Sequence, residues 1–255
     1  MPVGSDWFRI HVPRPSARLQ LICFPYAGGA ASVFREWGDM LPLVELISVQ
    51  YPGRQDRHGD PFAVTLTELA DRLAETIQPL LSRRTAFFGH SMGAIVAFEV
   101  ARRLRPRFPS PLTRLFVSAC APPAEAGPRG LRFDDTGLRN YVRELGGAEA
   151  ATVTEDDELW QLALPPLRAD LRLVETYRYI RGAPLACPIT AIAGSGDAFA
   201  TVEDMRRWRD HSVAGADIRA LPGGHFYFDS SLPELAKLLL IELDPEKAST
   251  SRSPG

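Results

Sequence analysis

The chain has 255 residues, of which 45% are hydrophobic and 24% are charged, a composition typical of an ordinary globular domain rather than a disordered chain. The formal net charge of −2 gives no electrostatic reason to expect nucleic acid or an anionic membrane as a partner. No apolar run in the sequence is long enough to span a bilayer, so no membrane association is expected.

The N-terminus and the cysteines indicate the cellular compartment. Residues 1–7 lack the basic-then-apolar layout of a signal peptide. Cys23, Cys120 and Cys187 are odd in number and lie in or beside apolar segments, which predicts buried thiols in a reducing cytoplasm. No two Cys or His residues stand at metal-ligand spacing, and no residue pattern implies a cofactor, so neither is expected.

Short apolar runs alternate with helix-period segments along the chain. Buried strands are predicted at residues 19–24, 44–49, 85–88, 115–119, 189–193 and 217–221. Helices are predicted at residues 34–41, 66–81, 93–104, 202–208 and 232–243. Continuous apolar strands separated by helices indicate an α/β fold with a mostly parallel sheet covered on both faces. We therefore expect a single domain over residues 1–243 and a polar, disordered tail over residues 244–255.

Residues 122–184, called the insertion below, interrupt this alternation because they contain no convincing strand. A Pro/Gly-rich lead at residues 122–130 precedes helical patterns near residues 137–145 and 157–180. The insertion is too long for a plain loop between two core strands, which favours a helical lid over a site. The alternative is that these helices pack on the sheet as structural bulk.

Gly89-His90-Ser91-Met92-Gly93 matches the G-x-S-x-G pattern of a nucleophile elbow. An apolar strand leads into it and a helix-forming run leaves it, and the flanking glycines permit a strained turn with close packing of strand against helix. Ser91 would lie at a helix N-terminus, whose dipole favours negative charge on the reacting oxygen. The alternative is an ordinary N-cap serine. The His90 side chain should point away from the nucleophile and pack.

A serine nucleophile needs a base, and in this chain order the acid and then the histidine follow it. His225 lies late in the chain, in a glycine-rich loop just past the last predicted strand. A lone loop histidine is often structural, but this location favours a catalytic role. The other candidates, His11, His58 and His211, fall in polar surroundings and are interpreted as surface residues.

Asp197 is the predicted acid because it follows the fifth predicted strand in the turn Gly194-Ser195-Gly196-Asp197. It would accept the ring N–H of His225 and so fix its tautomer. The alternative is an Asp that bonds its own backbone in a turn. Asp204, Asp210 and Asp217 are rivals, on a helix, at its end and at a strand start.

An oxyanion hole needs two backbone N–H groups near Ser91. One is predicted to come from Met92, the residue after the nucleophile, and the other from Ala27 in the loop at residues 25–30. The small residues of this loop let its backbone approach a substrate. Its Gly-Gly pair lacks the Lys and the spacing of a phosphate loop, which argues against a nucleotide site.

Several motifs together resemble the type II thioesterases, the external editing enzymes of polyketide and nonribosomal peptide synthesis, which have the α/β-hydrolase fold. The resemblance covers roughly residues 18–243 and is carried by residues 24–29 (Phe-Pro-Tyr-Ala-Gly-Gly), 51–54 (Tyr-Pro-Gly-Arg), 89–93, 167–170 (Leu-Arg-Ala-Asp), 175–177 (Glu-Thr-Tyr), 196–197 (Gly-Asp) and 223–226 (Gly-Gly-His-Phe). Many hydrolases share the elbow, but they do not share the two segments in the insertion.

The resemblance implies hydrolysis of aberrant or stalled acyl groups from the phosphopantetheine arms of acyl or peptidyl carrier proteins, through an acyl-serine intermediate. It places the catalytic triad on Ser91, Asp197 and His225. The phosphopantetheine belongs to the substrate. Only about eighteen residues precede the match, which favours a stand-alone enzyme over an integrated thioesterase domain. A monomer is expected.

The residues that bind the acyl chain and those that contact the carrier are predicted less directly than the triad. Tyr26, Trp160, Leu164 and Tyr177 are candidates for the chamber, although core packing explains the three insertion residues equally well. Carriers are usually acidic, so the basic residues of the insertion are candidate docking contacts, although such charges usually mark a solvated face. These residues are Arg168, Arg172 and Arg178.

Two other functions remain open from the sequence. The chain could be a different serine hydrolase, either a carboxylesterase or a macrocyclising thioesterase. It could also be a non-catalytic binding protein on a hydrolase scaffold, although a complete triad in the order of the fold argues against that. Comparing the turnover of thioesters with that of oxygen esters distinguishes the editing thioesterase from a different serine hydrolase. Absence of labelling by a fluorophosphonate would indicate the non-catalytic binding protein.

Overall fold

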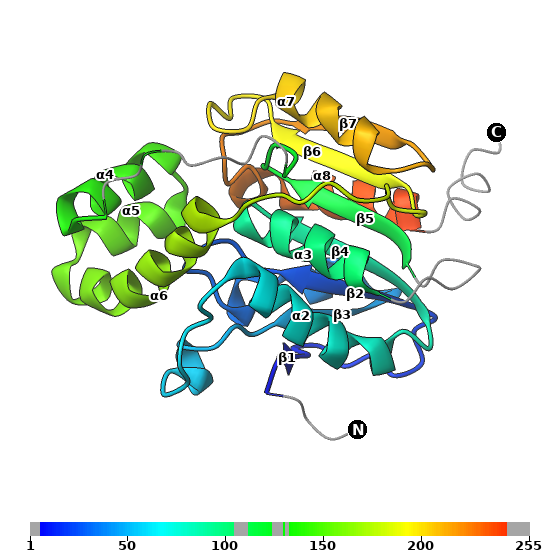
Figure 1. Ribbon diagram of the computed structural model, residues 1–255, viewed down its shortest axis with the longest axis horizontal. Helices are drawn as coiled ribbons and strands as arrows, with labels where there is room; N and C mark the ends of the chain where they lie inside the picture. Colours follow the sequence, from blue (N-terminus) through cyan, green and yellow to red (C-terminus); the bar gives the residue numbers. More distant parts are fainter. Residues whose placement is uncertain (1–5, 105–111, 124–129, 131–132, 244–255) are drawn as a thin grey trace.

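A computed structural model describes residues 6–104, 112–123, 130 and 133–243 (Figure 1). The tail expected at residues 244–255 lies outside the described residues. So does most of the Pro/Gly-rich lead of the insertion, since residues 124–129 are not described, and residues 131–132 after it are not described either.

The described strands form one seven-stranded sheet in the order β1-β3-β2-β4-β5-β6-β7. Strand β1 runs antiparallel to β3, and all other neighbours are parallel. This confirms the mostly parallel sheet predicted from the apolar runs. The strands are β1 (Phe8–Arg9), β2 (Leu19–Phe24), β3 (Val44–Val49), β4 (Arg84–His90), β5 (Leu112–Ser118), β6 (Ile189–Gly194) and β7 (Ala216–Leu221).

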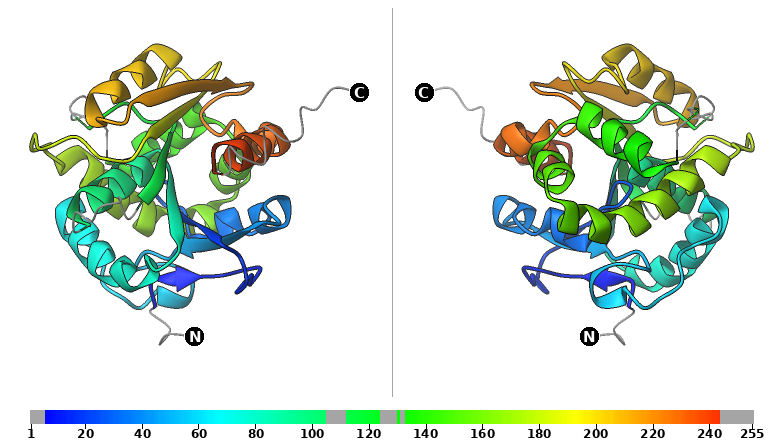
Figure 2. Two further views of the ribbon diagram at one scale, coloured as in Figure 1. Left: turned by 90° about the vertical axis from the view of Figure 1, so that its right-hand side faces the viewer. Right: turned by 90° about the vertical axis from the view of Figure 1, so that its left-hand side faces the viewer.

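Helices cover both faces of the sheet (Figure 2). On one face, Ile22 and Phe24 of β2 pack in a cluster with helices α2 (Leu66–Ile77) and α3 (Met92–Arg103). On the other face, Leu21 and Cys23 pack in a second cluster with α1 (Trp37–Met40) and α8 (Phe228–Leu243). Successive side chains of a strand point to opposite faces, so a strand buried on both faces is apolar throughout.

The predicted helices exist, but several are divided. The segment predicted as one helix at residues 34–41 forms a 3-10 turn, η1 (Ala31–Phe34), and then α1. Helix α2 continues into η3 (Gln78–Leu80), and α7 (Val202–Arg206) into η4 (Arg207–His211). Helix α8 begins at Phe228 and is kinked at Ser231 (φ −123°), just before Pro233, because proline lacks an N–H donor and clashes with the preceding turn.

The insertion contains three described helices, α4 (Asp135–Leu145), α5 (Ala148–Glu155) and α6 (Asp157–Thr176), grouped at one end of the sheet (Figure 1). They enclose a small apolar cluster of their own, which consists of Leu138, Trp160, Leu164, Leu167 and Leu171. Helix α5 was not predicted separately. It is set off by Gly146 and Gly147, whose positive φ angles of 73° and 97° end α4.

Helix α6 ends at Thr176, four residues before the predicted limit, where a buried polar contact fastens the chain to α3. The Tyr177 hydroxyl donates to Glu99 Oε1 at 2.6 Å. The buried Glu99 carboxylate also accepts from Arg102 at 2.6 Å and from Arg103. Burial, followed by the hydrogen bond to Glu99, raises the pKa of Tyr177, so the phenol stays a donor. Through this contact the insertion is attached to the helix that follows Ser91.

The described residues also show the state of the cysteines, the character of the helices and the grouping of metal-ligating side chains. Cys23, Cys120 and Cys187 are buried and free, as predicted, and burial raises the pKa of Cys187 to about 11. Among the described helices, none combines the length and the apolar character needed to cross a membrane. Within the described residues, no group of three or more His, Cys, Asp or Glu side chains could hold a metal ion.

The hydrogen bond at the end of α6 predicts a specific loss of stability. Tyr177→Phe should lower the free energy of unfolding by about 1.5–3 kcal/mol, because the bond that is lost ends on a buried charged group. Urea denaturation measures this difference. Tyr179→Phe is the matched control: its ring is partly buried, but no hydrogen bond of its hydroxyl is recorded among the described residues. Equal losses in the two variants would refute this account.

Candidate active site

Ser91 stands between β4 and α3 in a strained backbone conformation. Its φ of 53° and ψ of −120° lie in a region that side-chain-bearing residues rarely adopt. The Ser91 N–H donates to the Ser118 carbonyl at 2.8 Å, and the Ala94 N–H donates to the Ser91 carbonyl at 3.0 Å. The Ser91 side chain makes no capping hydrogen bond to the helix that it precedes. Its hydroxyl is therefore not used as an ordinary N-cap.

The two glycines of the elbow are required by close backbone contacts. A Cβ atom on Gly93 would lie 2.1 Å from the Phe24 carbonyl oxygen at the end of β2. A Cβ atom on Gly89 would lie 2.2 Å from the Gly93 carbonyl oxygen. Real Cβ atoms do not approach backbone this closely, so only glycine fits at either position. The G-x-S-x-G pattern thus reflects the contact of helix α3 with strands β4 and β2.

His225 and Asp197 are brought together from the loops after β7 and β6. His225 Nδ1 lies 2.9 Å from Asp197 Oδ2. The other Asp197 oxygen accepts the N–H groups of Phe199 at 2.8 Å and Ala200 at 3.1 Å. Both side chains are buried, with 3% of His225 and 5% of Asp197 exposed. The rival Asp204 instead completes a capping box with Thr201.

The second ring nitrogen of His225 is the one available for proton transfer. Nε2 is buried and makes no hydrogen bond to any described residue, including Ser91. Since Asp197 occupies Nδ1, the ring would present Nε2 as the acceptor for a hydroxyl proton. Hydrogen bonds between nucleophile and base are often long in unliganded sites and shorten when substrate binds.

Ser118, which the sequence analysis missed, joins the elbow to the histidine loop. Its hydroxyl lies 2.9 Å from His90 Nδ1 and 2.7 Å from the Tyr227 hydroxyl, while its carbonyl accepts the Ser91 N–H. Tyr227 lies two residues after His225, and burial raises its pKa. The available signal was a polar residue at the carboxyl end of a central apolar strand, where active sites of parallel sheets form.

His90 packs among aromatic rings, in agreement with its predicted role. Its ring centroid is 5.1 Å from that of His225, 4.8 Å from Phe228 and 5.9 Å from Tyr26. Burial, followed by the neighbouring His225, lowers the pKa of His90 well below its usual value. Tyr26, predicted to touch substrate, therefore lies beside the elbow.

The expectation that His211 is a surface residue is wrong. It is buried, with ring centroids 5.3 Å from Phe98 and 5.4 Å from Trp208. The polar residues beside it in the sequence gave no sign of this aromatic packing, because Phe98 lies more than a hundred positions away on α3.

Ala27 and Met92 stand at the ends of two paired strands. In the register of β2 and β4, Phe24 pairs with Gly89, so the loop at residues 25–30 and the elbow begin at the same level. Met92 is the first residue of α3, and the first N–H groups of a helix have no intrahelical acceptor. Two N–H groups from these positions could converge on one oxyanion.

The other candidates for the acyl chamber lie in packed surroundings. Trp160 and Leu164 belong to the apolar cluster of the insertion, where Trp160 Nε1 donates to Asp135 Oδ1 at 2.6 Å. Tyr177 is bonded to Glu99 as described above. Their part in acyl binding stays a prediction.

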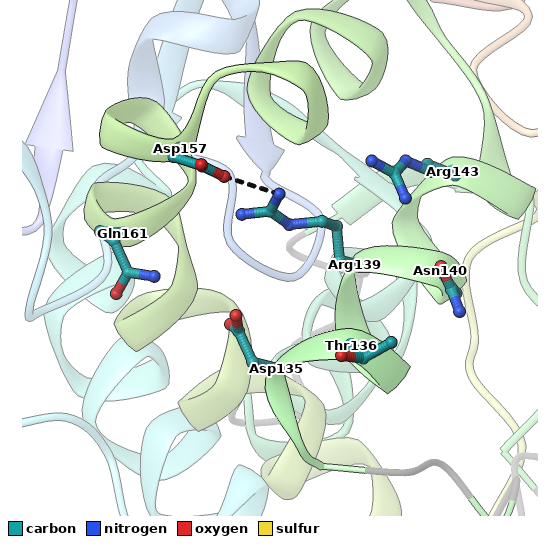
Figure 3. A pocket seen from close by; sticks show the side chains of 7 residues that line it. All are labelled: Asp135, Thr136, Arg139, Asn140, Arg143, Asp157 and Gln161. Atoms are coloured by element: carbon teal, nitrogen blue, oxygen red, sulfur yellow. Dashed lines mark ion pairs between the residues drawn. The ribbon is translucent and has the colours of Figure 1, made fainter.

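A polar cavity of about 450 Å³ lies in the insertion (Figure 3), but no residue predicted for the site lines it. It is bordered by Asp135, Thr136, Arg139, Asn140, Arg143, Asp157 and Gln161. In it, Arg139 Nη1 pairs with Asp157 Oδ1 at 2.8 Å. We assign this cavity no part in acyl binding.

Comparison with known proteins decides the family. The thioesterase domain family matches residues 19–240, which span all strands of the sheet except β1. The chain belongs to the thioesterase domain family. The fold and the order of the elbow, Asp197 and His225 are those of an α/β hydrolase, as expected, and the chain is a thioester hydrolase.

Individual relatives agree with this assignment. The thioesterase is 40% identical over 240 residues to thioesterase PikA5 of Streptomyces venezuelae, covering 92% of this chain and 85% of that protein. It is 35% identical to the gramicidin S biosynthesis protein GrsT of Aneurinibacillus migulanus, with 94% of each chain covered. The structure of the type II thioesterase BorB from the borrelidin biosynthetic cluster superposes with a TM-score of 0.84 at 36% identity, covering 94% and 99% of the two chains.

Buried His90 predicts a pH dependence of stability. Its folded-state pKa is lowered, so the unfolded chain takes up a proton at a pH where the folded chain does not. The stability contribution is complete above pH ~6.5 and falls with decreasing pH, by up to about 1.4 kcal/mol per pH unit. His90→Asn retains a polar atom for Ser118 and should flatten this part of the pH profile of unfolding free energy. Identical slopes below pH ~6.5 in native and variant protein would contradict the prediction.

Proposed function

We propose that this thioesterase acts as a stand-alone editing enzyme that hydrolyses aberrant or stalled acyl groups from phosphopantetheine arms of carrier proteins in polyketide or nonribosomal peptide synthesis. The observation that carries the proposal is the buried pair of His225 and Asp197, with Nε2 unoccupied, in a site that contains the strained Ser91. The similarity of the chain to GrsT and BorB supports a role in polyketide or nonribosomal peptide synthesis. The site of action would be the cytoplasm.

The proposed reaction has two acyl-transfer steps. Ser91 Oγ attacks the thioester carbonyl while His225 Nε2 takes its proton, and Asp197 stabilises the imidazolium that forms. The N–H groups of Ala27 and Met92 donate hydrogen bonds to the oxyanion, and collapse expels the pantetheine thiolate, which takes the proton from His225. A thiol with a pKa of ~8.5 is a far better leaving group than an amine. Water, deprotonated by His225, then attacks the acyl-serine; collapse releases the carboxylic acid, and the proton returns to Ser91.

We also propose that the helices of the insertion form a lid over this site. Ala27 packs against the apolar cluster of the insertion, and a Cβ atom on Gly28 would lie 3.3 Å from the Leu167 side chain. The insertion therefore contacts the loop that carries one of the proposed oxyanion donors. A lid in this place would exclude water from the acyl chain.

Removal of the proposed nucleophile tests the function. Ser91→Ala should abolish steady-state hydrolysis of short acyl-phosphopantetheinyl carrier protein, by about 10⁶ in kcat if the triad acts as a unit. The native chain should form a covalent adduct with a fluorophosphonate, detectable by mass spectrometry, and the variant should not. Ser195→Ala, which changes an exposed serine in the turn before Asp197, is the matched control and should remain active.

The same assay separates the alternative activities. An oxygen ester and a thioester of the same acid are compared under identical conditions, and thioesters on a carrier should be turned over much faster. Faster cleavage of the oxygen ester, with inert carrier thioesters, would eliminate the editing function and leave a general serine hydrolase. Cyclic products from long acyl chains would indicate a macrocyclising enzyme.

We expect exposed arginines of the insertion to contact the acidic carrier protein. Arg172 and Arg178 are exposed, whereas Arg168 is only partly exposed and its Nε is buried. Arg172→Glu with Arg178→Glu should raise KM for acyl-carrier roughly fivefold, as expected for two exposed charge contacts, and leave KM for free acyl-pantetheine unchanged. Arg84→Glu with Lys237→Glu is the charge-matched control, since Arg84 begins β4 at the opposite end of that strand from Ser91. Equal effects of the two double variants would exclude docking at these two arginines.

A further inference from the structure

Residues 25–30, which carry Ala27, are called the oxyanion loop below. We infer that Asp170 and Arg54 are positioning residues that hold this loop in its catalytic geometry. The inference rests on the proposed function, because it assigns the Ala27 N–H to the oxyanion hole. It explains why two motifs far from the triad in the sequence, at residues 51–54 and 167–170, accompany the elbow in this chain.

One buried ion pair makes two hydrogen bonds to the oxyanion loop, one from a loop N–H group and one to a loop carbonyl oxygen. Arg54 and Asp170 form a bidentate pair, with Nη1–Oδ2 at 2.6 Å and Nη2–Oδ1 at 2.9 Å. Asp170 Oδ2 also accepts the Gly28 N–H at 2.8 Å, and Arg54 Nη1 also donates to the Gly29 carbonyl at 3.0 Å. Only 3% of Asp170 and 6% of Arg54 are exposed. Two consecutive residues of the loop are therefore fixed by charge-assisted hydrogen bonds.

The fixed residues belong to a tight turn that aims the Ala27 N–H. The Gly29 N–H donates to the Tyr26 carbonyl at 2.9 Å, and Gly28 has a φ of 81°. This is the pattern of a type II turn with Ala27 and Gly28 at its two central positions, where the second requires a positive φ. The turn closes through the Gly29 N–H, so the Ala27 N–H is left unused by the turn. Holding Gly28 and Gly29 therefore orients the peptide group that Ala27 offers to a substrate.

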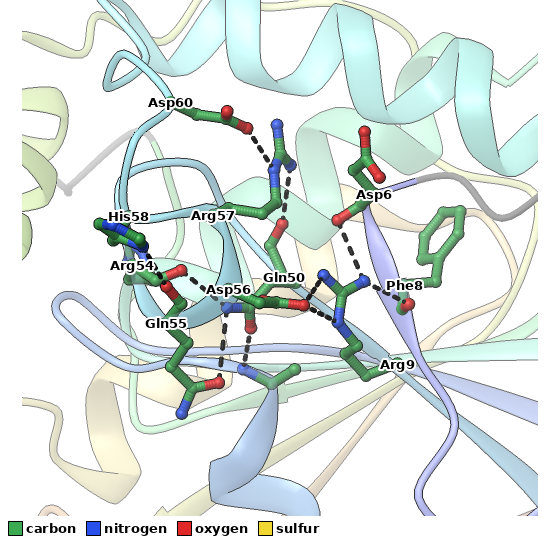
Figure 4. Close-up of polar contacts among 11 residues, drawn as sticks. Asp6, Phe8, Arg9, Gln50, Arg54, Gln55, Asp56, Arg57, His58 and Asp60 are labelled. Atoms are coloured by element: carbon green, nitrogen blue, oxygen red, sulfur yellow. Dashed lines mark hydrogen bonds and ion pairs between the residues drawn. The ribbon is translucent and has the colours of Figure 1, made fainter.

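Arg54 is itself held by the end of β3 (Figure 4). The buried Gln50 side chain donates to the Arg54 carbonyl at 3.1 Å and accepts the Ala31 N–H at 2.8 Å. Gln55, the next residue, has a positive φ of 48°, and Arg9 of β1 pairs with Asp56. The backbone around Arg54 is thus held by contacts at Arg54 itself and at Asp56, and its guanidinium extends from this fixed backbone to the oxyanion loop.

Asp170 is held by the half of α6 that is fastened to the core. Leu167, one turn earlier, packs on Gly28, and Tyr177, two turns later, is bonded to Glu99 on α3. Burial of two charges is weak evidence for stability, since apolar residues of similar volume often do as well or better. A geometric function explains the pair better, because its hydrogen bonds converge on the loop next to Ala27.

The test uses three single variants of the full chain. Asp170→Asn removes the charge, and Arg54→Lys keeps a charge but cannot form the bidentate pair. Both should lower kcat for acyl-carrier hydrolysis by about 10- to 100-fold, less than or equal to the effect of deleting an oxyanion donor, with KM within twofold. Glu99→Gln is the control, since it removes the charge of another buried carboxylate, which pairs with the partly exposed Arg102 and Arg103 of α3, and it should keep kcat at a temperature well below its melting midpoint.

A pair of inhibitors distinguishes positioning from general loss of structure. A trifluoromethyl ketone analogue of acyl-pantetheine forms an oxyanion on Ser91, and its Ki should rise in proportion to the fall in kcat/KM. A non-hydrolysable thioether analogue forms no oxyanion, and its Kd should stay unchanged in both variants. Melting curves and circular dichroism establish that each variant is folded under the assay conditions.

Several results would overturn the inference. Native-like kcat and ketone affinity in folded Asp170→Asn or Arg54→Lys would do so. Equal losses of affinity for both inhibitors, or a fall of kcat in Glu99→Gln as large as in those two variants, would do so too. If Asp170→Asn does not fold, Arg54→Lys, which retains the charge, decides the question. If the native chain fails to hydrolyse acyl-carrier, the proposed function falls, and the two inhibitors still test whether the ion pair positions the loop.

Discussion

The approach of helix α3 to the end of strand β2 sets the geometry of the whole site. The Gly93 position comes so close to the Phe24 carbonyl that no Cβ atom fits between them. This contact brings the first N–H of α3 beside the loop that leaves β2, and it forces the strained turn at Ser91. Ser118 then extends the arrangement to the histidine loop, since its carbonyl holds the Ser91 N–H and its hydroxyl contacts both His90 and Tyr227. Backbone proximity thus determines where each reacting group lies.

Buried polar contacts link the insertion to this arrangement at two points, one on α6 and one just after it. Asp170 reaches the oxyanion loop and Arg54, while Tyr177 reaches Glu99 on the helix that follows the nucleophile. Each contact joins segments that are more than seventy residues apart in the sequence. An apolar surface could stabilise the same packing with less directional preference, because hydrophobic burial does not specify the orientation of a peptide group. Hydrogen bonds to charged groups specify that orientation.

The sequence was most informative where one local pattern determines one local structure. Apolar runs gave the six long strands, and the spacing of glycines around Ser91 gave the elbow. Strand β1 escaped prediction because it has two half-buried residues, too few for a periodic signal. Residues 51–54 and 167–170 drew attention only through a family resemblance, since no local pattern shows that Arg54 and Asp170 meet across 116 positions. Ser118 was missed because its partners come from other segments, and the burial of His211 was missed because Phe98 comes from a distant one.

Within α6, two prolines stand between Leu164 and Leu167, both of which belong to the apolar cluster of the insertion. Pro165 and Pro166 have no N–H to donate to the preceding turn, so two backbone hydrogen bonds of the helix are missing at this place. Before them, Trp160 and Leu164 pack against α4; after them, Asp170 is fixed by Arg54. The helix is therefore least braced by its own backbone between these two parts. The apolar cluster continues across the prolines through Leu167 and Leu171, so side-chain packing joins the two parts of α6 where the backbone hydrogen bonds are missing.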